Sequence, residues 1–225
     1  MMDNRPGWRR ESLVLRVSEM FGDRDRWIFY HNMAFNSSLW GRVRVGNYLD
    51  AVLAPRPLLE YPSIGHDINV LMFVMASTIE SFVFSLNALG WGLRDDGFLS
   101  VRTDAGRVFP EIVEKVWFRQ TFPRVAEVFR TRKEATLRPI RDNHAVTKHR
   151  HHVLFSGEPS RTDLPPWMFA CDPTVPTDPK KHLDDERGPR EYVRVVDLVT
   201  GFASTMQEAE AAACDDIEAR LAADA

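Results

Sequence analysis

The sequence lacks most of the features that mark secreted, zinc-binding or strongly basic proteins. It has two cysteines in 225 residues, Cys171 and Cys214, and they form neither a disulfide framework nor a zinc ribbon. The 29 Lys and Arg are outnumbered by 32 Asp and Glu, so a nucleic-acid partner would require a local basic patch. The first residues, MMDNRPGWRRESLVLRV, lack the apolar core and cleavage site of a signal peptide. We therefore expect a cytoplasmic protein with reduced cysteines.

Strand signals and internal repeats are also scarce, whereas helical patterns recur along the chain. A hydrophobic content of 44% with 27% charged residues is enough to build one globular core. Helices and loops are expected over residues 1–62 with a turn or helix cap at 36–38, a bundle core over 67–155, and a last helix over 190–222. The sequence thus predicts an all-α fold, an up-down helical bundle, as a single domain over 1–225.

The longest apolar segment predicts a central helix. Residues 68–89 are apolar on every face, Asp67 is a suitable N-cap, and glycines at 90 and 92 end the pattern. A membrane span is the alternative, but Glu80 lies near its centre, where a charge costs roughly 2.5–3.5 kcal/mol. We expect a buried helix and no membrane partner. Glu80 then either pairs with a buried polar group or supports a neighbouring site.

Prolines mark the remaining boundaries. Pro123 is expected to open a helix, and Pro139 to kink or restart the chain before a helix that runs to about Leu154. Half of the 14 prolines fall between Pro159 and Pro189, among Asp, Thr and Gly. Because no periodicity is visible there, residues 156–189 are expected to form a long irregular insertion before the last helix.

The strongest local pattern is a basic, histidine-rich helix. Four of the seven histidines lie between 144 and 152. At 3.6 residues per turn, one arc of about 100° collects Arg141, His144, Lys148, His151 and His152. The opposite face carries valines, so it is expected to meet the core.

Three interpretations of this helix remain open. It is a solvated polar face, a metal site, or an anion site for phosphate or RNA. A metal site is limited to His149 and His152, the one pair at ligand spacing, with cations beside it, so we expect no metal and no cofactor. In an anion site, Arg and Lys hold the phosphate while a histidine transfers protons.

The segment Arg138-Pro-Ile-Arg-Asp-Asn-His144 resembles the HEPN superfamily of RNA- and nucleotide-directed helical domains. The family pattern is an Arg followed, after four to six residues, by a His at the last helices of a bundle. The stretches NHAVTKHRHH and IESFVFSLNALG also look like parts of uncharacterised bacterial HEPN-type proteins. The resemblance covers about residues 67–155, with the last helix completing the bundle.

The resemblance implies metal-independent RNA cleavage of a defence or toxin type. His144 would act as general base or acid on the ribose 2′-hydroxyl, and Arg138 or Arg141 would stabilise charge on the phosphate oxygens. Apart from the resemblance, Lys148, His151 and His152 are the candidate substrate-binding residues of this helix, and Glu80 is a candidate for orienting His144 or Arg141.

The expected partners are RNA, a second copy of the chain and an antitoxin or other protein. The alternative function is a non-catalytic helical interaction or scaffold module that forms a homodimer.

Overall fold

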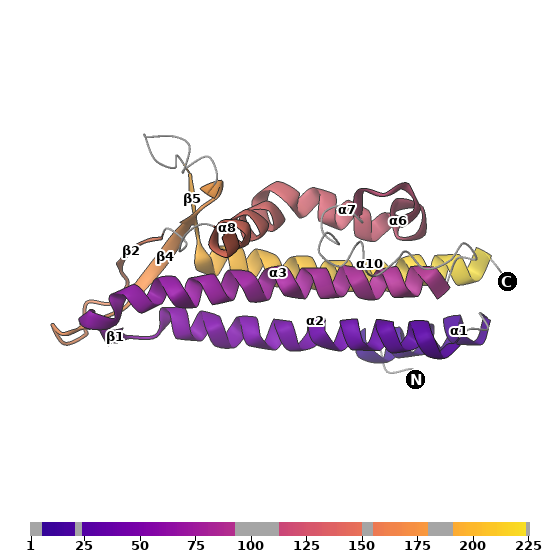
Figure 1. Ribbon diagram of the computed structural model, residues 1–225, viewed down its shortest axis with the longest axis horizontal. Helices are drawn as coiled ribbons and strands as arrows, with labels where there is room; N and C mark the ends of the chain where they lie inside the picture. Colours follow the sequence, from indigo (N-terminus) through magenta and orange to yellow (C-terminus); the bar gives the residue numbers. More distant parts are fainter. Residues whose placement is uncertain (1–5, 21–23, 93–112, 150–154, 180–190, 224–225) are drawn as a thin grey trace. The chain divides into compact units, whose positions relative to one another are not determined.

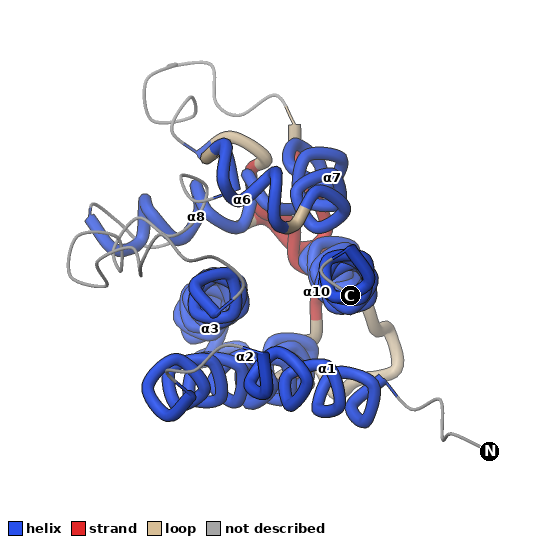
Figure 2. Tube along the Cα trace, turned by 90° about the vertical axis from the view of Figure 1, so that its right-hand side faces the viewer, coloured by secondary structure: helices blue, strands red, loops and turns tan. Residues whose placement is uncertain are grey.

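Helices dominate the protein, as the sequence predicts. The computed structural model describes residues 6–20, 24–92, 113–149, 155–179 and 191–223. Helix accounts for 79% of these residues, and short strands make up a small sheet component (Figure 2). The helical class is therefore confirmed. The finer assignment, an up-down bundle of HEPN type, stays a prediction.

The chain forms two compact units. Unit 1 comprises Met1–Leu39, Thr78–Thr131 and Thr205–Ala225, and unit 2 comprises Trp40–Ser77 and Arg132–Ser204. Three of the four boundaries fall within long helices, and the fourth lies just before the last residue of a shorter helix, so these helices contribute residues to both units. The prediction of one domain over 1–225 stays a prediction.

The described part of the chain consists mainly of successive helices (Figure 1). They are α1 (Pro6–Met20), α2 (Arg24–Leu53), the 3-10 turn η1 (Leu58–Glu60), α3 (Tyr61–Gly92), α6 (Val116–Thr121), α7 (Pro123–Arg132), the π-turn η2 (Lys133–Leu137), α8 (Arg138–His149) and α10 (Val195–Ala223). The predicted opening of α7 at Pro123 is confirmed, because proline at the first helical position loses no hydrogen bond.

Three predicted boundaries are wrong. The last helix, predicted over 190–222, begins at Val195, because Tyr192–Arg194 form a strand. No turn occurs at 36–38, because α2 continues through these residues and buries Ser38 completely. The central helix α3 begins at Tyr61 rather than at Asp67. Asp67 does not cap it and instead accepts a hydrogen bond of 2.9 Å from Nη1 of Arg56. Arg56 also donates to Ala51 O near the end of α2, so one buried guanidinium joins the end of α2 to the first turns of α3.

The core of unit 1 is made of aromatic and aliphatic side chains from several helices. The largest fully buried members are Ile79, Phe82, Phe118, Phe122 and Phe129. Phe82 of α3 meets Phe129 of α7 edge to face, with ring centroids 6.4 Å apart. Such pairs add to the free energy of burying the rings.

Unit 1 also buries two titratable groups. The Nδ1 atom of His31 lies 2.9 Å from Ser85 O, and its ring stacks on Phe35. Burial lowers the pKa of His31 to about 4. Asp216 of α10 accepts backbone N–H bonds from Arg124 (3.0 Å) and Val125 (3.2 Å), so it caps the N-terminus of α7. Burial raises the pKa of Asp216 to about 6 despite these two bonds.

Unit 2 contains the strands. β2 (Ser156–Pro159), β4 (Cys171–Pro176) and β5 (Tyr192–Arg194) form an antiparallel sheet in the order β2-β4-β5. β1 (Arg56–Pro57) pairs with β3 (Met168–Phe169). The expectation of an irregular insertion over 156–189 is therefore wrong for its described part. These strands are short and pair with distant residues, which leaves no local periodicity to detect.

Helices pack closely on one another in unit 2. A Cβ atom added at Gly201 of α10 would lie 2.8 Å from Oγ1 of Thr136 in the π-turn, so glycine permits this approach. The wide turn directly precedes α8, where Pro139 has no N–H to donate to the preceding turn. The predicted restart of the chain near Pro139 is thus seen as a π-turn, and α8 follows without a break.

One helical segment of the described part has the length and hydropathy of a membrane span. It covers Leu58–Gly90, with a mean hydropathy of 1.6, and 61% of that window is buried inside the structure. This degree of burial fits the predicted core helix. The cytoplasmic location stays a prediction.

Candidate functional site

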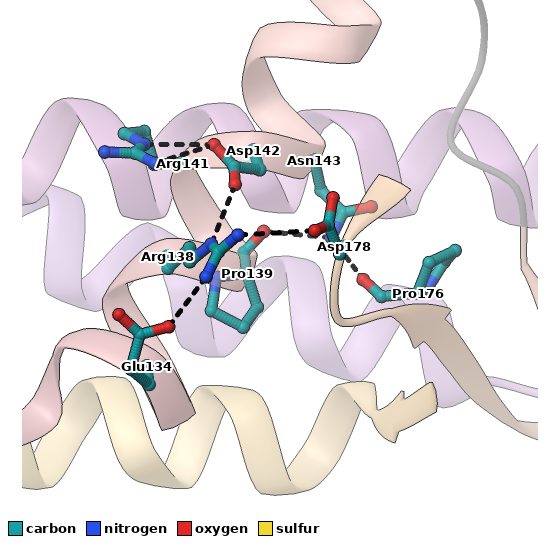
Figure 3. A network of polar contacts seen from close by, with 8 residues as sticks. All are labelled: Glu134, Arg138, Pro139, Arg141, Asp142, Asn143, Pro176 and Asp178. Atoms are coloured by element: carbon teal, nitrogen blue, oxygen red, sulfur yellow. Dashed lines mark hydrogen bonds and ion pairs between the residues drawn. The ribbon is translucent and has the colours of Figure 1, made fainter. Parts of the chain in front are cut away.

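The predicted site residues Arg138, Arg141 and His144 all lie on α8. The helix buries Ile140 and Val146, so one face meets the core of unit 2 as the sequence predicts. Its polar positions form a network with the chain after β4 (Figure 3). The members of this network differ in how many partners they have.

Arg138 is surrounded by acidic groups. Its guanidinium lies 2.9 Å from Glu134, 3.3 Å from Asp178 and 3.5 Å from Asp142, counting the closest nitrogen–oxygen pair in each case (Figure 3). The hydrogen bond with Glu134 raises the pKa of Arg138 above its ordinary value. A phosphate would have to compete with three carboxylates for this side chain. The geometry therefore favours a structural role for Arg138 over transition-state stabilisation.

Arg141 is held differently. Its Nε and Nη2 atoms both lie 3.0 Å from Oδ1 of Asp142, whose side chain is 3% exposed, while the Arg141 side chain is 37% exposed. Among the described residues, Nη1 of Arg141 has no hydrogen-bond acceptor. A buried carboxylate thus orients one edge of the guanidinium and leaves the other available. This arrangement suits a fork for an external anion.

Asn143 joins α8 to the end of β4. Its Nδ2 donates to Pro139 O at 2.9 Å and to Pro176 O at 2.8 Å, and the residue is 1% exposed (Figure 3). Asp178 anchors Arg138 only two residues beyond Pro176. Sequence reasoning missed Asn143 and Asp178. The Asp-Asn pair next to Arg141 is the one local signal that could have pointed to a buried polar contact.

His144 lies one turn after Arg141. At 100° per residue, three positions place these two side chains about 60° apart around α8, whereas His144 and Arg138 are about 120° apart. The His144 ring meets the ring of Phe73 on α3, with centroids 5.4 Å apart and planes at 60°. Phe73 is 54% exposed. Sequence reasoning missed Phe73, because a helix that is apolar on every face does not reveal which phenylalanine is exposed.

The other predicted site residues are not brought into this group by the described structure. Lys148 lies on α8, but its side chain and the whole of His151 and His152 are outside the described part. The metal alternative depends on His149 and His152, so it stays untested. Glu80 is half-buried on α3 in unit 1, and its supporting role stays a prediction.

The chain matches no family model, no curated protein and no solved structure. The HEPN resemblance therefore stays a prediction.

Proposed function

We propose that the protein is an RNA-directed HEPN-like protein that binds single-stranded RNA through Arg141, His144 and Phe73. One observation carries this proposal. A partly exposed arginine, oriented by a buried carboxylate, lies one helical turn from a histidine whose ring touches a half-exposed phenylalanine. We call these three residues the α8 surface.

Each member of the α8 surface has a distinct task in RNA binding. The open edge of Arg141 binds a phosphate oxygen, since guanidinium donors match phosphate geometry. Phe73 offers a face on which an unpaired base stacks, a contact worth roughly 1–3 kcal/mol per base. Double-stranded RNA hides its base faces, so we expect a preference for single strands.

A metal-independent cleavage follows from the same arrangement. His144 takes the proton of a ribose 2′-hydroxyl, the 2′-oxygen bonds to phosphorus, and the bond from phosphorus to the 5′-oxygen breaks. Arg141 stabilises the charge on the phosphate oxygens in the transition state. The leaving 5′-oxygen takes a proton from water, and the other end is a 2′,3′-cyclic phosphate. The cellular role implied by the resemblance is a cytoplasmic ribonuclease of defence or toxin type.

Arg141→Ala is expected to weaken binding of a short single-stranded oligouridylate about tenfold and to lower the salt slope of log K by about one. The reason is the loss of one phosphate contact. Fluorescence anisotropy at several salt concentrations measures both quantities. Arg130→Ala is the matched control, because Arg130 is an exposed, carboxylate-paired arginine on α7. Absence of RNA binding at low salt, or equal weakening by both variants, would contradict the proposal.

Phe73→Leu is expected to weaken the same binding without changing the salt slope, because it removes a stacking face and no charge. The expected loss is about fivefold to tenfold, within the range for one base–aromatic contact. Trp167→Leu, which alters an exposed aromatic residue elsewhere in unit 2, serves as the control. Unchanged affinity in Phe73→Leu would remove stacking from the proposal and leave only the phosphate contact.

A second candidate function is supported by a separate observation. Met33 and Leu39 of α2 are exposed, and residues 27–41 contain no charged side chain, which favours a homodimeric interaction module. This function needs no catalysis.

A further inference from the structure

The connection between α2 and α3 carries the most exposed large apolar side chain of the described residues. Leu59, in the 3-10 turn η1, is 95% exposed, and Leu58 before it is 49% exposed. Trp167, which directly precedes β3, is 67% exposed. Both segments belong to unit 2 and lie beside the strand labelled β1 in Figure 1. We call residues 57–61 and 165–168 the β1–β3 tip.

Backbone hydrogen bonds hold the two segments of the β1–β3 tip together. Leu58 donates its N–H to Trp167 O at 3.0 Å, directly beside the antiparallel pair of β1 and β3. Met168 donates its N–H to Pro165 O at 2.9 Å, so a β-turn runs between these two residues. Pro166 occupies the second position of this turn, where its fixed φ is favoured. A rigid turn therefore presents the Trp167 side chain to the solvent.

An aromatic cluster lies behind the tip in unit 2. The ring of Tyr61 meets the ring of Phe169 edge to face, with centroids 5.2 Å apart, and the ring of Phe155 at 5.4 Å. Phe155 and Phe169 are partly buried, and Tyr61 is 37% exposed. The packing of unit 2 thus uses the rings at the base of the tip and leaves Leu59 and Trp167 in water.

We propose that the β1–β3 tip binds the surface of a phospholipid bilayer, with Leu59 and Trp167 inserted among the lipids. A side chain that is 95% exposed projects from the protein, so a protein partner would need a pocket shaped for it, whereas a fluid bilayer needs none. Trp is enriched at the level of the headgroups and anchors proteins there. The sequence predicts no membrane partner because its longest apolar segment is a core helix, but contact with one leaflet requires no spanning segment.

The backbone of the tip suits an apolar medium. Three of its nine positions are prolines, which have no N–H group. Three other positions donate their N–H groups within the tip: Leu58, Tyr61 and Met168. An N–H group that enters lipid without an acceptor is strongly unfavourable, because no water is there to replace the lost hydrogen bond. Six of the nine positions therefore carry no such penalty.

The charges beside the tip predict which lipids it binds. Arg56 pairs with Asp67 at 2.9 Å, and Arg161 pairs with Asp163 at 2.6 Å. Glu60, within the tip, is exposed and adds a negative charge. The described residues next to the tip in sequence therefore offer anionic headgroups no uncommitted cation. We expect binding to neutral bilayers that does not weaken as the salt concentration rises.

The apolar area of the tip sets the strength of the contact. With roughly 150–250 Å² per large side chain, the exposed parts of Leu58, Leu59, Tyr61 and Trp167 offer on the order of 400 Å². We therefore expect weak, reversible binding, half complete at about 0.1–1 mM lipid, the range of a single acyl anchor. The proposal does not rest on RNA binding, because it uses no residue of the α8 surface.

Flotation of the full chain with phosphatidylcholine vesicles tests the contact. Wild type is expected to float with the vesicles, and Leu59→Glu and Trp167→Ser are each expected to weaken binding about tenfold with unchanged circular dichroism. Trp40→Ser is the matched control, because Trp40 is a tryptophan of unit 2 that is 66% exposed. Absence of wild-type binding at about 1 mM lipid overturns the proposal. So does an equal loss in Trp40→Ser and Trp167→Ser.

A fluorescent label reports insertion directly. Cys171 and Cys214 are buried, so an introduced surface cysteine is the one that reacts with the label. On Leu59→Cys, an environment-sensitive dye is expected to brighten and shift to the blue when vesicles are added, and to be quenched by brominated acyl chains. On Asn47→Cys, an exposed position of α2 in unit 2, the dye is expected to stay unchanged. Unchanged emission at position 59 in a protein that floats with vesicles overturns the proposal.

Two further results would assign the contact elsewhere. If wild type binds only vesicles that contain phosphatidylserine, and high salt releases it, a basic surface outside the tip binds the lipid and the proposal is overturned. If wild type binds no vesicles but sediments as a dimer that Leu59→Glu dissociates, a second copy covers the tip and the proposal is overturned as well. Binding to neutral vesicles that persists from about 0.1 to 0.5 M salt is the result that supports it.

Discussion

His144→Ala is expected to abolish RNA cleavage and to leave the fold intact. Under the proposed mechanism His144 transfers a proton in the chemical step, and such groups contribute a factor of about 10²–10⁴ to the rate. The side chain is only half-buried, so its removal is expected to cost less than about 1 kcal/mol of folding free energy. The measurement is the rate of cleavage of a labelled single-stranded RNA, alongside thermal melting of both proteins.

The controls for this experiment separate catalysis from binding and from contamination. His66→Ala removes an exposed histidine of α3 and is expected to cut at the wild-type rate. Cleavage is expected to persist in EDTA and to leave a 2′,3′-cyclic phosphate. If His144→Ala still cuts at the wild-type rate, the catalytic role of His144 is wrong. If wild type binds RNA and never cuts it, the α8 surface is a binding site alone.

The sequence predicted the long helices because their cores are periodic or continuously apolar. The extent of α3 beyond Asp67 was missed, since the end of this helix is set by tertiary contacts. Asp67 pairs with Arg56, eleven residues earlier in the chain. The false turn at 36–38 has a related cause. Asn and Ser favour caps and turns when exposed, but Ser38 is buried in α2 and the surrounding helix overrides this preference.

The strands of unit 2 could not be predicted from local patterns. Ser156 pairs with Thr174, and Thr174 pairs with Arg194 on its other side. Each pairing joins residues about twenty positions apart in short segments, and β2 and β4 contain proline. Only the alternating burial within β4 is a strand signal, and proline and aspartate at its positions mask it.

The α8 surface was predictable in part. Arg141 and His144 are three positions apart, and this spacing alone places them on the same side of the helix. Only one of these two acidic partners of Arg138 could be predicted from its position in the sequence. Glu134 lies one turn earlier on the chain, but Asp178 lies forty residues later and reaches Arg138 through the fold. Sequence could therefore locate the cations, but it could not show which one is neutralised and which one is open.

The second large effect is expected in the pH dependence of stability of unit 1. His31 is 2% exposed, and burial lowers its pKa from 6.5 to about 4. The unfolded chain therefore binds a proton first as the pH falls. This contribution to stability is present above pH 6.5 and is lost toward pH 4. A shift of this size corresponds to roughly 3 kcal/mol.

Asp216 acts in the opposite direction. It is 4% exposed, and burial raises its pKa from 3.8 to about 6, although its bonds to the backbone of Arg124 and Val125 favour the charged form. The unfolded chain releases this proton first as the pH rises. The contribution of Asp216 to stability is therefore greatest below pH 3.8 and falls by on the order of 3 kcal/mol by pH 6. Between pH 4 and 6 the two groups nearly cancel.

Single substitutions should separate the two effects. His31→Asn leaves Asp216 alone, so the free energy of unfolding is expected to fall from pH 4 to 6 relative to wild type. Asp216→Asn keeps an oxygen for the N-terminus of α7 and leaves His31 alone, so stability is expected to rise over the same interval. Urea denaturation at several pH values measures the difference of each variant from wild type. The double variant lacks both opposed contributions. Its change in free energy of unfolding between pH 4 and 6 is therefore expected to match that of wild type within about 1 kcal/mol. Parallel profiles for wild type and both single variants would show that neither group titrates differently in the folded and unfolded chains.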